Sequence, residues 1–270
     1  MVEIAICLAI IGFALVAIIG VLPIGMNTQR DNREETVINQ DATMFMEAIR
    51  NGVRGLDDLT NYVYNITNYW TEYDRDGVVP RILQYGVDTY SLTNQTFSLN
   101  GSPFLTVPIP FRITNGLRIV GLLSTPEYTA INGLPIPTLM RGGRSNHIVA
   151  WVYSMSGPAV EKPPQPNDSI IRQDSFGYRI LCVNAPAAVD TNNFTLAAKD
   201  PVYIHNQQLT ANLHELRLTF LWPQLANGNV GPGRQTFRTM VAGQITLTND
   251  PAYGPRSLYF YQPQSFNNAP

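Results

Sequence analysis

The pattern of apolar and polar residues divides the chain into a helical N-terminal part and a longer part with strand-like patterning. From Ile4 to Gln29 there is no charged side chain, and Ile4–Ile24 is almost wholly Ile, Leu, Val, Ala and Gly. About 20 apolar residues in a helix span the roughly 30 Å hydrocarbon core of a bilayer. This segment is therefore predicted to form a helix long enough to cross a membrane.

A second helical pattern follows a polar stretch at 27–35. Apolar residues return there at steps of three and four, which is typical of one face of an amphipathic helix. These residues are Ile38, Ala42, Phe45, Ile49 and Val53. We expect this stripe to pack against the rest of the protein. Gly52 and Gly55 are stop signals that place the end of the helix at about residue 54.

Four helix-weakening residues lie within the apolar segment: Gly12, Gly20, Pro23 and Gly25. Proline removes a backbone hydrogen bond, and each glycine costs about 1 kcal/mol in a helix interior. Two interpretations stay open: either this stretch can unwind, or the glycines allow close packing of helices. The sequence predicts one nearly continuous helix, interrupted only between Gly12 and Gly25.

Beyond Leu56 the sequence changes to short runs rich in β-branched and aromatic residues, separated by Pro, Gly and Asn, which is typical of antiparallel strands. The runs are 104–111, 117–123, 147–153, 178–183, 216–222, 236–247 and 257–261. Residues 56–73 are expected to form a short helix or loop, and 158–168 an extended, proline-rich connection. The predicted fold class is α+β, with a helix over 1–55 packed on an antiparallel β-sheet head over 56–270.

Composition narrows the possible functions. Charged residues make up 14% of the chain, well below the ~25% usual for soluble domains. The net charge of −2 leaves no basic stripe for phosphates, so nucleic acid is not an expected partner. Cys7 lies in the apolar helix and Cys182 in a predicted strand, so the two are not expected to pair.

The sequence contains no recognisable catalytic or metal-binding motif. His147, His205 and His214 are scattered without metal-ligand spacing, and the common nucleophile, phosphate-loop and zinc motifs are missing. The segments 74–77 and 249–250 carry oxygen ligands but not a complete calcium loop. We therefore expect neither an enzyme nor a bound metal or cofactor.

Aromatic residues are concentrated directly after the helix, between Tyr62 and Tyr90. Such a cluster can anchor the head on its own helix or contact neighbouring molecules. A sugar-binding surface is the rival interpretation.

Glu3 stands at the edge of the apolar segment, where a carboxylate is costly to bury and is a functional candidate by default. One interpretation places it simply at the membrane interface. The other gives it a positively charged partner on a neighbouring copy of the chain.

The run from Val2 to Pro23, with Glu3 nine residues before Gly12 and an Ile-Ile-Gly step, resembles the N-terminal segment of type IV pilins and type II secretion pseudopilins. The resemblance covers about the first fifty residues. In the family a basic leader precedes the mature chain and the Glu is the fifth mature residue. Here Glu3 is third and no such leader is seen, so we expect the start to be truncated or differently assigned. Pro23 falls later than in most members, which shifts the expected local bend.

The resemblance implies a pilin-like fold and a structural role as a subunit of a type IV pilus-like extracellular filament. The expected partners are identical copies in a helical filament, the inner membrane before assembly, and the pilus or secretion assembly machinery. The residues expected to serve assembly are Glu3, Gly12, Gly20, Pro23 and Gly25. Two alternatives stay open: a low-copy pseudopilin of a secretion or pilus-tip complex, and a membrane-anchored adhesin or enzyme that never polymerises.

Overall fold

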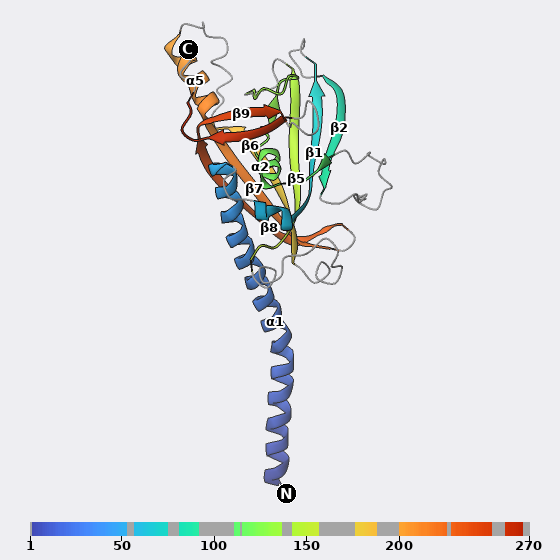
Figure 1. Cartoon of the computed structure of the whole chain (residues 1–270). Helices are drawn as coiled ribbons and strands as arrows, with labels where there is room; N and C mark the ends of the chain where they lie inside the picture. Colours follow the sequence, from blue (N-terminus) through green and yellow to red (C-terminus); the bar gives the residue numbers. More distant parts are fainter. Residues whose placement is uncertain are drawn as a thin grey trace. The chain divides into compact units, whose positions relative to one another are not determined.

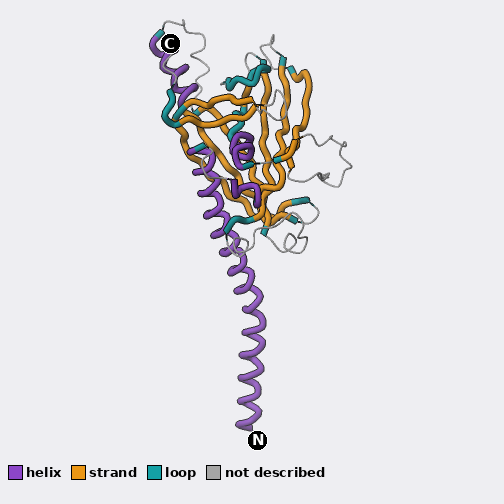
Figure 2. Tube along the Cα trace, viewed as in Figure 1, coloured by secondary structure: helices purple, strands orange, loops and turns teal. Residues whose placement is uncertain are grey.

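The structure is a computed structural model that describes residues 2–52, 57–74, 81–91, 111–113, 115–136, 142–156, 176–187, 200–225, 228–249 and 257–266. The chain is α+β, as predicted: a long N-terminal helix precedes a domain built on an antiparallel sheet (Figures 1 and 2). Two compact units, residues 1–40 and 41–270, divide within the helix. The last turns of the helix therefore belong to the second unit.

Helix α1 spans Val2–Asn51 without a break. The predicted interruption between Gly12 and Gly25 is therefore wrong for the single chain, because even Pro23 lies inside the continuous helix. The helix ends three residues before the expected position. Gly52 follows it with a φ of 57°, the left-handed conformation in which glycine commonly terminates helices.

After α1 the described part of the chain alternates strands with three short helices. The described elements are η1 (Asp57–Asn61), β1 (Val63–Tyr73), β2 (Ile82–Ser91), β3 (Phe111–Arg112), α2 (Gly116–Leu123), β4 (Tyr128–Thr129), β5 (Gly143–Tyr153), β6 (Gly177–Pro186), α5 (Pro201–Asn212), β7 (Leu213–Gln224), β8 (Val230–Ala242), β9 (Gln244–Asn249) and β10 (Ser257–Gln262). The large sheet has the strand order β3-β2-β1-β5-β6-β7-β8, and β4 pairs with β5. Its pairs are antiparallel except β2 with β3, and β9 and β10 form a separate antiparallel pair.

One face of the large sheet forms the core. Along β6 and β7 the apolar residues alternate, so that Ile180 lies opposite Phe220 and Cys182 opposite Leu218, all buried. This alternation places every second side chain on one face. Helix α2 and the β9–β10 pair lie over that face in Figure 1, and α2 contacts β10, β1 and β5.

The predicted strands at 147–153, 178–183, 216–222 and 257–261 are confirmed within β5, β6, β7 and β10. The run 236–247 is two strands, β8 and β9, separated at Gly243. The proline-rich connection at 158–168 lies outside the described residues. So does the predicted strand at 104–111, apart from Phe111, which belongs to β3.

Two assignments were wrong. Residues 117–123 form helix α2 rather than a strand, because the Asn115 side chain caps the helix by accepting a hydrogen bond from the Arg118 N–H at 3.0 Å. Residues 56–73 were expected to be a helix or loop, but only η1 is helical there, and 63–73 form the long strand β1. Strand β2 and helix α5 had no sequence prediction.

Candidate membrane and assembly site

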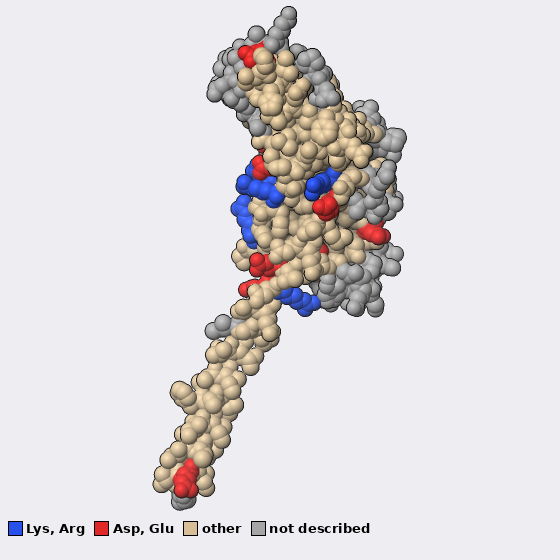
Figure 3. All heavy atoms as spheres, turned by 90° about the vertical axis from the view of Figure 1, so that its left-hand side faces the viewer, with Lys and Arg blue, Asp and Glu red and all other residues tan. Residues whose placement is uncertain are grey.

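The first half of α1 presents apolar side chains on all sides. Every large apolar side chain described between Val2 and Met26 is more than half exposed, from 52% at Leu22 to 80% at Phe13. In Figure 3 this stretch is an uncharged column with acidic atoms at its N-terminal tip. Soluble monomers rarely expose a continuous apolar surface larger than a few hundred Å². Such a surface requires lipid or other apolar helices to cover it.

The same stretch is long enough to cross a membrane. Helix α1 is the one described helix whose length and composition would allow it, and its most apolar window is not buried by the rest of the protein. At about 1.5 Å per residue, Ile4–Ile24 extends roughly 30 Å, the thickness of the hydrocarbon core. The N-terminal helix can therefore serve as a membrane anchor.

Glu3 lies in the first turn of α1 and is exposed. A negative charge at this end of a helix interacts favourably with the helix dipole. None of the described ion pairs includes Glu3. A positively charged partner on another copy therefore stays a prediction.

Among the residues that the structure describes, nothing requires glycine at positions 12, 20 and 25. A Cβ atom added at any of these three positions would meet nothing within 4 Å. Each glycine nevertheless costs about 1 kcal/mol relative to alanine in a helix. Close approach of another helix would give these glycines a role that the single chain does not.

Small residues also share one face of this helix. Ala5, Ala9 and Gly12 follow at steps of four and three, and Gly20 comes about two turns later. Helices in membranes pack most closely where small residues let their backbones approach. Glu3 does not belong to this set, so any contact through Glu3 would use a different face of the helix.

The second half of α1 packs into the head. Ala42, Phe45 and Ile49 are fully buried, and the ring centroid of Phe45 lies 6.5 Å from that of Phe220 on β7. Ile38, at the start of the same stripe, is also buried but belongs to the first compact unit. Val53 lies outside the described residues. Residues 41–51 are thus an integral part of the head's core.

A buried carboxylate, Asp41, lies on the same face and was not singled out from the sequence. It accepts hydrogen bonds from the Met155 N–H at 3.0 Å, from the Tyr178 hydroxyl at 2.8 Å and from the Ser156 hydroxyl. Burial raises the pKa of the Asp41 carboxyl, and the hydrogen bonds from Ser156, Met155 and Tyr178 oppose that rise. Asp41 therefore attaches α1 to the end of β5 and to β6.

The head shows little chemistry beyond packing in its described part. No group of three His, Cys, Asp or Glu side chains there could hold a metal ion. His147 and His205 are exposed, whereas His214 is buried. The incomplete calcium segments at 74–77 and 249–250 lie mostly outside the described residues. The Cys182 thiol, whose pKa burial raises, donates to the Leu123 carbonyl at 2.9 Å, so it acts as a core residue.

The aromatic cluster after α1 is largely built into the sheet. Tyr64 stacks on Tyr153 with ring centroids 4.5 Å apart, and the Arg144 guanidinium lies 4.5 Å from the Trp70 ring centroid. Tyr85 on β2 differs, since it is 82% exposed. Most of these rings therefore stabilise β1 and its neighbours.

Comparison of the chain with protein-family models, with curated proteins and with solved structures gave no match. The structure itself defines a protein with an apolar N-terminal helix that can anchor it in a membrane and an antiparallel β-sheet domain into which the end of that helix packs.

Proposed function

We propose that the chain is a structural subunit of a type IV pilus-like filament that polymerises through the first half of α1. The observation that carries the proposal is the apolar surface between Val2 and Met26, which is exposed on all sides of the helix. A single membrane anchor would need the same surface. The pilin-like pattern of Glu3 and Gly12, together with three glycines where an added Cβ would meet nothing within 4 Å, favours contact with other copies.

In this proposal the subunit first rests in the inner membrane with Ile4–Ile24 in lipid. Assembly machinery then moves it into a filament, where the apolar helices bundle at the centre and the β-rich heads lie outside. Lipid and helix surfaces are similarly apolar, so each contact contributes little and many repeated contacts are needed. Because one surface of a subunit contacts a different surface of the next, the assembly continues without closing.

Glu3 has the most specific role in this mechanism. In the dry centre of the bundle its carboxylate would accept a charge-assisted hydrogen bond from the N-terminal ammonium of a neighbouring subunit. A buried charge that lacks a partner is strongly unfavourable. The pairing would therefore select one axial register between neighbouring helices.

Electron microscopy of material sheared from the surface of producing cells tests the proposal. We expect abundant filaments in which this chain is the main component. A few copies of the chain among filaments made of other subunits would instead indicate a low-copy pseudopilin. Recovery only as a monomer from the detergent-extracted membrane would contradict polymerisation and leave a simple anchored protein.

A further inference from the structure

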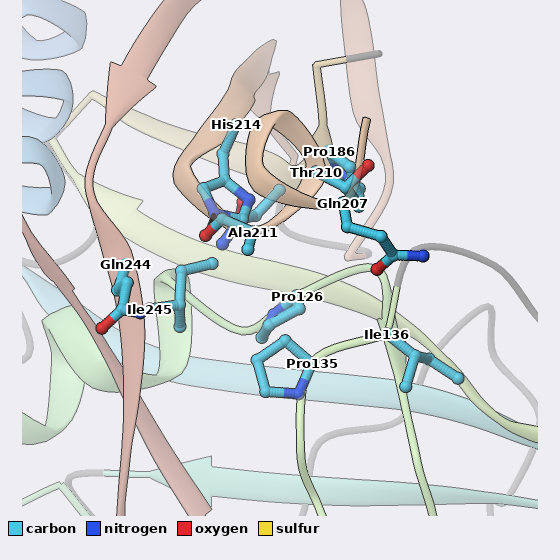
Figure 4. A pocket seen from close by; sticks show the side chains of 11 residues that line it. Pro126, Pro135, Ile136, Pro186, Gln207, Thr210, Ala211, His214, Gln244 and Ile245 are labelled. Atoms are coloured by element: carbon cyan, nitrogen blue, oxygen red, sulfur yellow. Dashed lines mark hydrogen bonds between the residues drawn. The ribbon is translucent and has the colours of Figure 1, made fainter. Parts of the chain in front are cut away.

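A cavity of about 290 Å³ opens at one end of the head, where elements distant in the sequence meet (Figure 4). Helix α5, the end of β6, the starts of β7 and β9 and the loops beside β4 contribute to its lining. Its apolar lining includes Pro126, Pro135, Pro186 and Ile245. This volume lies at the lower end of the range for small-molecule sites.

The polar lining consists of groups that are uncharged at neutral pH. It includes the amides of Asn184, Gln207 and Gln244, the hydroxyl of Thr210 and the imidazole of His214. None of the described lining residues carries a carboxylate, ammonium or guanidinium group. The His214 imidazole is buried, and burial lowers its pKa to about 4, so it is neutral as well. The cavity offers hydrogen bonds without a charge to attract or balance an ion.

Helix α5, which forms one wall, is poorly buried by the protein itself. None of its residues is fully buried, although the Asp200 side chain caps its start by accepting from the Val202 N–H at 2.8 Å. The Asn206 Nδ2 atom is shielded from solvent and has no hydrogen-bond acceptor among the described residues. Asn206 lies four residues before Thr210, and a buried donor without a partner is unfavourable. Asn206 itself does not line the cavity, whereas Gln207, Thr210 and Ala211 of α5 do, so a ligand there would cover part of this poorly buried helix.

The geometry points to a binding site for one unit of a neutral sugar in this cavity. The Asn184 amide is already bonded to the Ser124 carbonyl and the Tyr261 hydroxyl, and the Gln244 Oε1 atom accepts from Ser265. The Gln207 amide offers both a donor and an acceptor and the Gln244 Nε2 atom offers donors, and sugar hydroxyls can pair with either. The proline rings and Ile245 provide apolar surfaces for the C–H groups of a sugar ring. In Figure 4, Gln207 and His214 on one side and Pro126 and Pro135 on the other surround an open space. This inference concerns the head alone and does not depend on filament assembly.

Saturation-transfer NMR on the full chain tests the site. The protein would be held in lauryldimethylamine oxide micelles, because that detergent has no sugar headgroup. The probes are glucose, galactose, mannose and N-acetylglucosamine, and glucuronic acid serves as a charged counterpart. We expect saturation transfer to at least one neutral sugar and binding of glucuronic acid that is weaker by about tenfold or more, since its carboxylate would lose solvation without gaining a cation.

Variants locate the binding. Gln207→Ala and Gln244→Ala should each weaken binding of the neutral sugar by about tenfold, the usual effect of one lost hydrogen bond. Asn61→Ala removes an exposed amide from η1, away from the cavity, and should leave binding unchanged. The proposal is overturned if no neutral sugar binds, or if the Gln207 and Gln244 variants bind as tightly as the parent. It is also overturned if a blocked neutral peptide such as N-acetyl-alanine amide binds and the sugars do not.

Discussion

The Tyr178 hydroxyl donates a hydrogen bond of 2.8 Å to the Asp41 carboxylate, a contact between residues 137 positions apart in the chain. Tyr178 is fully buried on β6, and Asp41 is fully buried on α1. Met155 and Ser156, just past the end of β5, donate to the same carboxylate. One side chain of the helix therefore satisfies three donors, one on β6 and two just past the end of β5, and fixes the angular position of residues 41–51 in the head.

Replacing Asp41 should destabilise the head. Asp41→Ala leaves the Met155 N–H and the Tyr178 hydroxyl buried without an acceptor, and each such donor costs about 1–3 kcal/mol. We expect the free energy of unfolding to fall by about 2–5 kcal/mol, measured by urea denaturation with tryptophan fluorescence. Asp31→Ala, at an exposed position of the same helix, should change it by less than about 0.5 kcal/mol. Equal stability of the two variants would show that the Asp41 contacts contribute nothing.

An acidic residue in place of Phe45 should separate α1 from the core. Phe45 is fully buried, and an unpaired carboxylate at that position would cost several kcal/mol. Met44→Asp is the matched control, because Met44 is the preceding helix residue and is 52% exposed. Circular dichroism melts should show a large loss of thermal stability for Phe45→Asp and a small one for Met44→Asp. Similar melting of both variants would contradict the packing described for this half of the helix.

The sequence was sufficient to predict the elements in which periodicity and burial agree. The apolar segment and the stripe at Ala42, Phe45 and Ile49 indicated the helix, and short runs rich in β-branched and aromatic residues indicated β5, β6 and β7. Asp41 could have been found, since it lies three residues after Ile38 and four before Phe45, on the same helix face. A polar residue inside an apolar stripe is the signal that was available.

In the elements that the sequence did not predict, α2, α5 and β1, the residue pattern and the burial did not agree in this way. Residues 117–123 are apolar except for Arg118, and a run of seven residues is too short for periodicity to separate a helix from a buried strand, so the cap at Asn115 was the signal that was available there. Helix α5 has no apolar face, although Asp200 followed by Pro201 is a typical helix start. In strand β1 the polar residues Asn65 and Thr67 are buried by the neighbouring strands, so the buried positions are not marked by apolar residues. The cavity beside α5 depends on contacts between distant segments, which local patterns do not encode.

Acid should weaken the head through His214. Burial lowers the pKa of His214 to about 4, from an ordinary value of 6.5, so the unfolded chain binds the proton more tightly. The free energy of unfolding should therefore fall as the pH decreases from about 6.5 to about 4, by up to about 3 kcal/mol. His214→Gln should lack this dependence, measured by urea denaturation at several pH values.

The same comparison isolates His214 from Asp41. The raised pKa of Asp41 has the opposite effect on the free energy of unfolding, because the folded state then binds the proton more tightly. Asp41 is present in both the parent and His214→Gln, so its effect is the same in both. Stability curves that stay parallel for the parent and His214→Gln over this pH range would show that the imidazole is not held neutral by burial.

The turn between β8 and β9 should tolerate only glycine at position 243. Gly243 has a φ of 117°, and a Cβ there would collide with the carbonyl oxygen of Gln262. We expect Gly243→Ala to lower the free energy of unfolding by about 3 kcal/mol or more. Gly177→Ala is the control, because an added Cβ there meets its nearest atom at an ordinary 3.5 Å. A Gly243→Ala protein as stable as Gly177→Ala would contradict the described turn.

The proposed function depends most on Glu3, whose role in assembly can be separated from membrane insertion. Glu3→Ala makes the N-terminal segment more apolar, so the protein should insert into the membrane as well as the parent or slightly better. Only a role of Glu3 in assembly predicts that fewer filaments form, because the ammonium of the neighbouring subunit would then be buried without its counter-charge. Glu3→Gln should be milder, since the amide oxygen still accepts one hydrogen bond.

The measurement is the yield of sheared surface filaments from cells producing Glu3→Ala, divided by the amount of the same protein in the membrane fraction. We expect this ratio to fall by about tenfold or more relative to the parent, while the membrane amount does not fall. An intermediate ratio is expected for Glu3→Gln. Filaments from Glu3→Ala cells at the parent ratio would contradict a role of Glu3 in assembly and show that it is only an interfacial residue.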